Sequence, residues 1–77
     1  MKHADFKIGE EFWTGAGKWR VTDIGTRTII AIRTTQNWEP VAEGWLKGPP
    51  YTVAEHVFSE GEFQWCYPTE EAYKGSF

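Results

Sequence analysis

The stretch from residue 12 to residue 32 restricts the fold of this chain more than any other part of its sequence. It reads FWTGAGKWRVTDIGTRTIIAI, in which three runs rich in β-branched and aromatic residues are separated by two glycine-containing turns. Gly15 and Gly17 suit the first turn, because glycine tolerates the positive φ that tight hairpins require. The stretch therefore predicts three consecutive antiparallel strands.

The second hairpin has a preferred register if Gly25 and Thr26 form a two-residue type II′ loop, which favours glycine at its first position. Side chains alternate between the two faces of a sheet. This register puts four apolar residues on one face: Trp19, Val21, Ile30 and Ile32. The opposite face then carries a lysine and all three arginines of the chain: Lys18, Arg20, Arg27 and Arg33. A slip by one residue would break the apolar set, so we expect its face to be the core face.

The second half of the chain favours loops and further short strands. The connection over residues 34–50 is interrupted by glycine and proline, and loops this long in so small a domain are typically functional or mobile. Residues 51–58 are rich in β-branched and aromatic residues, which favours a strand. Thr52 and Glu55 in the same segment instead resemble a helix capping box. We favour the strand and keep the helix as the alternative.

The ends of the chain complete the expected architecture. Residues 62–67 read as a last strand, residues 1–5 are expected to fray, and residues 68–77 form one helical turn or a loose tail. The whole sequence, residues 1–77, then predicts a single all-β domain with one short helix as an option. Five to six short strands with closely spaced turns favour a small antiparallel barrel-like or strongly bent sheet.

Aromatic content is high for a domain of this size. The chain holds five tryptophans, five phenylalanines and three tyrosines among 77 residues. One small core does not easily hide this bulk, so we expect some of these rings at the surface or beneath a partner chain.

Charge and cysteine usage argue against several classes of protein. The net charge of −3 disfavours nucleic-acid binding, which usually needs a basic balance. Charge is divided between a basic first half and an acidic second half, which suits packing within one molecule or between copies of it.

Cys66 is the single cysteine and cannot form an internal disulfide. There is no membrane-spanning run and no signal-peptide core, so we expect a cytoplasmic protein with no membrane partner.

A spaced motif extends from the first hairpins into the rest of the chain. It runs Phe-Trp-Thr-Gly, Gly, Trp-Arg, Thr-Asp and Gly-Thr-Arg-Thr-Ile over residues 12–29, then Gly-Pro-Pro-Tyr over 48–51 and Val-Ala-Glu with Val-Phe over 53–58. In this pattern the chain resembles a family of small uncharacterised bacterial proteins that look like products of genomic or mobile gene cassettes. The family has no known activity, so the resemblance implies one bacterial domain and leaves function open.

Two groups of residues are candidates for a binding site. Exposed tryptophan and tyrosine are enriched at interfaces, which singles out three residues of the long connection: Trp38, Trp45 and Tyr51. Arginine forks bind phosphate and carboxylate, which singles out Arg20, Arg27 and Arg33. The structural alternatives are that the aromatic loop caps one end of the sheet and that the arginines pair with the acidic second half.

Catalytic signals are weak. His56 and Cys66 are the only candidates for a base and a nucleophile, and Asp23 is the best placed carboxylate. Asp23 next to a glycine turn more often accepts backbone N–H bonds, and a lone cysteine in a strand is more often a buried hydrophobe. No metal-ligand spacing and no cofactor motif accompany them, so we predict no catalytic residue, metal or cofactor.

These observations lead to three hypotheses for function. The first is a small binding domain that self-associates through exposed aromatic residues and has an unknown small ligand or protein partner. The second is a binder of single-stranded nucleic acid or of a phosphate-bearing ligand through the arginines. The third is an enzyme that uses Asp23, His56 and Cys66.

Overall fold

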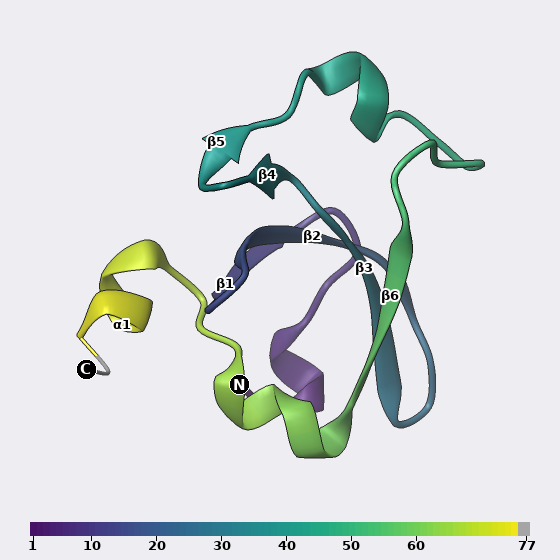
Figure 1. Ribbon diagram of the computed structural model, residues 1–77. Coiled ribbons are helices and arrows are strands. Elements are labelled where there is room, and N and C mark those ends of the chain that lie inside the picture. Colours follow the sequence, from purple (N-terminus) through teal and green to yellow (C-terminus); the bar gives the residue numbers. More distant parts are fainter. Residues whose placement is uncertain (76–77) are drawn as a thin grey trace.

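The computed structural model describes residues 1–75, and its centre is an antiparallel sheet of four strands (Figure 1). Their order in the sheet is β1 (Glu11–Thr14), β2 (Gly17–Ile24), β3 (Thr28–Arg33) and β6 (Glu55–Ser59). A second, two-stranded sheet is the hairpin of β4 (Thr35–Gln36) and β5 (Glu39–Pro40). Three 3-10 turns and one helix complete the chain: η1 (His3–Asp5), η2 (Glu43–Leu46), η3 (Glu60–Trp65) and α1 (Glu70–Lys74).

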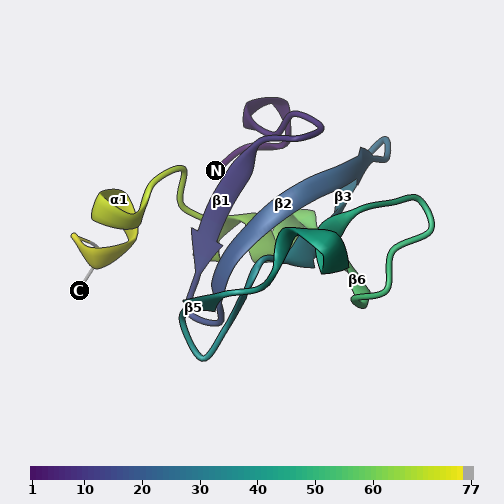
Figure 2. The same ribbon diagram turned by 90° about the horizontal axis from the view of Figure 1, so that it is seen from above.

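The predicted β class is confirmed, with six strands in two antiparallel sheets and a few short helical turns. The four strands of the larger sheet do not close into a barrel, since its order runs from β1 to β6 and the described residues add no ladder that joins these two ends. On the outer side of β1, Trp13 forms a single β-bridge with Tyr67. The α1 helix lies beyond β1, on the side of the molecule opposite to β6 (Figure 2).

The register of the second hairpin differs from the predicted one by two residues next to the turn, where Asp23 pairs with Ile30, and by one residue at Trp19. The last ladder pair is Ile24 with Ile29, so the loop is longer than two residues, and Gly25 N–H donates to the carbonyl of Thr28 at 2.9 Å within it. Beyond a register shift between Val21 and Asp23, Trp19 pairs with Arg33 rather than with Ile32. The prediction was wrong because a glycine after a strand is compatible with hairpin loops of several lengths, and the continuous apolar run of β3, residues 29–32, fits more than one register.

A β-bulge in β2 turns Ile24 toward the core. Ladder pairing shifts between Val21 and Asp23, which leaves Thr22 as the extra residue. Ile24 therefore lies opposite Ile29 and packs against the core, although strict alternation from Val21 would turn it outward.

The core lies on one face of the sheet, beneath η1 and η3 (Figure 1). Its centre is aromatic: Phe12 is fully buried, and Phe58 meets it edge-to-face with ring centroids 5.4 Å apart. Trp19 is also buried, and its indole N–H donates to Thr14 Oγ1 at 2.8 Å, so burial leaves no unpaired polar atom there. The other members of the core are Phe6, Val21, Ile29, Ala31, Phe63 and Cys66.

The opposite face of the sheet is covered only in part. Ile32 lies on it opposite Arg20 and is fully buried, and Leu46 of η2 is also buried. Arg20 Nη2 lies 3.2 Å from Glu43 Oε1, which ties η2 to this face. The predicted apolar set is therefore wrong for Ile30 and Ile32, which lie on the face away from the main core.

The segments around β6 differ from the prediction at their ends. Within residues 51–58 the strand begins at Glu55 and continues to Ser59, without a helix. The last predicted strand, over residues 62–67, is wrong, because η3 occupies most of it. Ser59 N–H donates to Glu62 Oε1 at 3.1 Å, so a local capping box favours a helical turn over the extended conformation.

The terminal segments are also ordered in the structure. Residues 3–5, within the part expected to fray, form η1, and His3 Nε2 lies 2.7 Å from the carbonyl of Gly25. α1 begins after Thr69, whose side chain accepts from Ala72 N–H at 3.0 Å. The remainder of the expected tail, residues 76–77, lies outside the described residues. None of the helices in residues 1–75 is long and apolar enough to cross a membrane.

Candidate functional site

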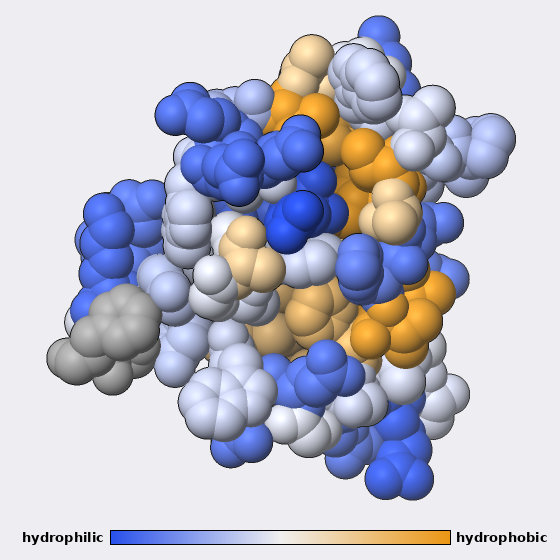
Figure 3. All heavy atoms as spheres, in the orientation of Figure 1, coloured by the Kyte–Doolittle hydropathy of each residue, from blue (hydrophilic) through white to orange (hydrophobic). Residues whose placement is uncertain are grey.

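An open cavity of about 630 Å³ lies between the β4–β5 hairpin, η2 and the segment that leads into β6. In the surface view, hydrophobic and strongly hydrophilic residues meet at this place, between the hairpin and β6 (Figure 3). Its volume falls within the range of small-molecule sites, which are about 300–1,000 Å³. The lining residues that matter most are Arg33, Gln36, Asn37, Val41, Trp45 and His56.

The β4–β5 hairpin forms one wall because its turn is tight. Gln36 pairs with Glu39, so only Asn37 and Trp38 connect the strands, with φ of 50° and 65°. Two consecutive positive φ values are typical of the type I′ turn that two-residue hairpins favour. Asparagine tolerates this conformation well, whereas an aromatic residue rarely adopts it.

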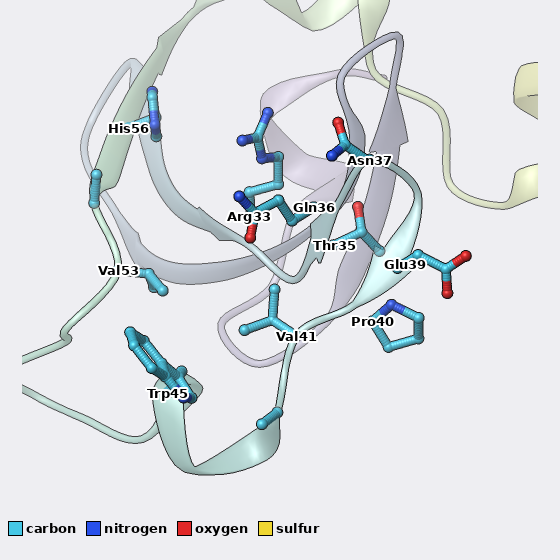
Figure 4. Close-up of a pocket in the computed structure, with 12 residues that line it drawn as sticks. Arg33, Thr35, Gln36, Asn37, Glu39, Pro40, Val41, Trp45, Val53 and His56 are labelled. Carbon is cyan, nitrogen blue, oxygen red and sulfur yellow. The ribbon is translucent and has the colours of Figure 1, made fainter.

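Arg33, at the end of β3, is the central charge of the cavity. Its side chain is exposed, and no residue of the described chain is bonded to it or forms an ion pair with it. The side chains of Arg33 and Gln36 extend into the middle of the opening, with Asn37 and His56 on either side (Figure 4). Glu39 also lines the cavity, but its carboxylate points away from Arg33 (Figure 4).

Trp19 of β2 is a neighbour of both Arg33 and His56. Arg33 is its partner across the β2–β3 ladder, and directly opposite residues of an antiparallel pair share a face. His56 of β6 meets the Trp19 ring edge-on, with centroids 5.0 Å apart and planes at 81°. The core tryptophan therefore positions both Arg33 and His56 at the same side of the sheet.

The far end of the cavity is apolar. Trp45 is 59% exposed, and its ring faces Val41 and Val53 across this end of the opening (Figure 4). Thr52 Oγ1 donates to the Trp45 carbonyl at 3.0 Å, which holds η2 against the segment before β6. The cavity thus combines one unpaired guanidinium and two amide side chains with an aromatic and aliphatic wall.

The other two arginines are engaged elsewhere, so the predicted common face for all three is wrong. Arg20 lies on the opposite face, where it pairs with Glu43, and its Nη2 is also 3.9 Å from Glu11 Oε2. Arg27 lies in the β2–β3 loop, with its Nε 2.8 Å from Glu60 Oε1. This hydrogen-bonded contact raises the pKa of Arg27 and lowers the pKa of Glu60.

These pairs agree with the structural alternative for Arg20 and Arg27, since both bind glutamates of the acidic second half. Arg33 does not follow it. The difference arises from register: Arg33 pairs with Trp19 and so lies on the face opposite to Arg20, where no acidic side chain of residues 1–75 forms an ion pair with it.

The three aromatic residues of the long connection are not brought together. Trp38 leaves the cavity and stacks on Trp13 and on Tyr73, with centroids 6.0 Å and 5.6 Å away. Tyr51 is half-buried and packs against Gly48. Only Trp45 of the three lines the cavity.

The candidate catalytic residues do not form a unit. Asp23 Oδ1 accepts from Ile24 N–H at 2.8 Å, and Cys66 Sγ lies 3.6 Å from the carbonyl of Glu62 within the core. Burial raises the pKa of the Cys66 thiol to about 11, which opposes thiolate formation. No hydrogen bond within residues 1–75 links either residue to His56. The described chain also holds no group of three histidine, cysteine, aspartate or glutamate side chains that could bind a metal ion.

No protein-family model matches the chain, and no curated protein and no solved structure matches it either. The resemblance to a family of small bacterial proteins therefore stays a prediction.

The sequence pointed to Arg33 and Trp45 but not to their neighbours. Nothing in the sequence marks Gln36 and Asn37 as site residues beyond their place near a turn. The sequence singles out His56 only as a candidate catalytic base. Their meeting depends on the pairing of β3 with β6, which are separated by the long connection. A local pattern cannot show this pairing.

Proposed function

We propose that this domain binds a small organic anion in the cavity, a carboxylate or phosphate attached to an apolar or aromatic body. The observation that carries the proposal is the exposed guanidinium of Arg33. It has no acidic partner in the described chain, and it lines a concave, partly apolar site.

The chemistry of the walls supports this class of ligand. A guanidinium presents parallel N–H groups that match the two oxygens of a carboxylate or phosphate. The side-chain amides of Gln36 and Asn37 add neutral donors beside it (Figure 4). Trp45 and Val41 offer a surface on which an aromatic or aliphatic body loses contact with water.

A single guanidinium favours a small ligand over a nucleic-acid strand. Strand binding usually follows a groove of several positive charges. Arg20 and Arg27 are paired with glutamates and lie away from Arg33, so no such row connects the three. Self-association through exposed aromatic residues stays a prediction, and Trp38 is a weaker candidate for it because its ring is already stacked.

Titration with benzoate and phenyl phosphate tests the proposal, with benzyl alcohol as the uncharged analogue. Two-dimensional NMR follows the Trp45 indole and the Arg33 side chain. We expect saturable shifts of both signals with the anions and none with the alcohol. Arg33→Gln removes the charge and should weaken binding roughly tenfold or more.

Arg27→Gln is the matched control, since Arg27 is an exposed arginine in the β2–β3 loop, paired with Glu60. It should bind the anions as the unmodified protein does. The proposal fails if the unmodified protein shows no saturable shift, or if the two arginine variants lose affinity equally.

A further inference from the structure

The outer edge of β6 is an unpartnered border of the sheet. β6 pairs with β3 on one side and is last in the strand order on the other. Four of its five residues are exposed, and Val57 is a large apolar residue with 61% of its surface accessible. Lysine, proline and bulges are common means of protecting such an edge, and β6 has none of them.

The direction of the backbone groups of β6 follows from the neighbouring ladder. Thr22 Oγ1 donates to the carbonyl of Ile30 at 3.2 Å, and Thr34 N–H donates to the Lys18 carbonyl at 2.8 Å. The even-numbered residues of β3 therefore direct their backbone groups to β2. Since antiparallel ladders alternate, Ala31 directs its backbone groups to β6.

The pairing of β3 with β6 then defines the free edge. Ala31 pairs with His56, so His56 bonds inward and its neighbour Val57 directs N–H and C=O out of the sheet. Ser59 lies two residues after Val57, so its backbone groups also point outward. Its N–H accordingly donates to Glu62 Oε1 and not to β3.

We propose that this edge pairs with the β6 strand of a second copy of the chain, antiparallel and centred on Val57. A twofold axis at Val57 lets each Val57 donate to and accept from its counterpart. Glu55 then lies opposite the partner's Ser59. This arrangement joins two four-stranded sheets into one continuous antiparallel sheet.

The side chains of β6 are complementary to themselves in this register. The two Val57 side chains meet beside Ile30 of each copy, which forms an apolar row across the axis. The negative charge does not oppose itself, because Glu55 faces a serine. Glu55 Oε1 also lies 3.0 Å from Thr22 Oγ1, which keeps the carboxylate over its own sheet and away from the edge.

Sedimentation velocity over a concentration series tests this proposal. One strand pair is a small interface, so we expect dissociation in about the micromolar range or weaker. Val57→Lys adds a charge at the axis and should weaken the dimer roughly tenfold or more. Ile8→Lys, at an apolar residue that is 64% exposed and outside β6, is the matched control and should leave the dimer intact.

Trp45→Ala separates this surface from self-association through the aromatic loop and from ligand binding. It should leave the dimer intact even where it weakens the binding of anions. Amide exchange gives a second readout on the unmodified protein: Val57 N–H should exchange more slowly as concentration rises. A monomer at every concentration, a dimer that survives Val57→Lys, or Val57 exchange that is independent of concentration would each overturn the proposal.

Discussion

The indole rings of Trp13 and Trp38 stack with their centroids 6.0 Å apart and their planes 12° from parallel. Tyr73 of α1 also stacks on Trp38. These contacts tie three elements together, namely β1, the β4–β5 hairpin and α1. They also account for a tryptophan at φ 65°, since the ring contacts offset the cost of a left-handed aromatic residue.

Trp38 variants should separate the ring contacts from the backbone strain. Trp38→Gly and Trp38→Ala both lose the stack, but only glycine adopts the positive φ without cost. Trp38→Ala should therefore be less stable than Trp38→Gly by about 1 kcal/mol, measured by urea unfolding. Equal stability of the two variants would show that the turn does not hold this conformation in solution.

Gly17 should not tolerate a side chain. Its φ is 130°, and an added Cβ would meet Thr35 Oγ1, the atom that accepts from Lys18 N–H at 3.1 Å. Gly17→Ala should reduce the free energy of unfolding by about 2 kcal/mol or more. Gly61→Ala is the control, because nothing lies within 4 Å of its added Cβ, and a change within about 0.5 kcal/mol is expected there.

Phe12 should be the most sensitive core position. It is fully buried, and both Phe6 and Phe58 meet its ring edge-to-face, at 5.3 Å and 5.4 Å. Phe12→Ala leaves a cavity and should cost about 3–5 kcal/mol in urea unfolding. Trp65→Ala removes a larger ring that is 63% exposed, and a loss as large as that of Phe12→Ala would contradict the assigned core.

Cys66 should make stability fall at high pH. Burial raises the pKa of its thiol from 9.0 to about 11, so the folded state retains the proton after the unfolded chain has lost it. The contribution of this group is complete below pH 9 and is lost as the pH rises toward 11. The difference in unfolding free energy between the unmodified protein and Cys66→Ala should shrink across this interval. A difference that is constant with pH would contradict the raised pKa.

The pattern of neighbouring residues predicted the strands of the first two hairpins but not which residues pair across β2 and β3. The strands over Glu11–Thr14 and Gly17–Ile24 follow from glycine turns between β-forming runs. The register at Trp19 did not follow, because a β-bulge at Thr22 shifts the pairing by one residue and places Arg33 on the same face as Trp19. The alternation of side chains alone does not predict a bulge within a strand.

The sequence by itself determined the β class, the first three strands and the presence of surplus tryptophan. These depend on near neighbours along the chain, where turn chemistry and side-chain alternation act directly. Tertiary structure alone decided that β6 returns to β3 and that Arg33 and His56 line one cavity beside Trp19. The physical reason is that this distant pairing is stabilised by burial of Phe58 against Trp19 and Phe12, a contact between residues far apart in the sequence.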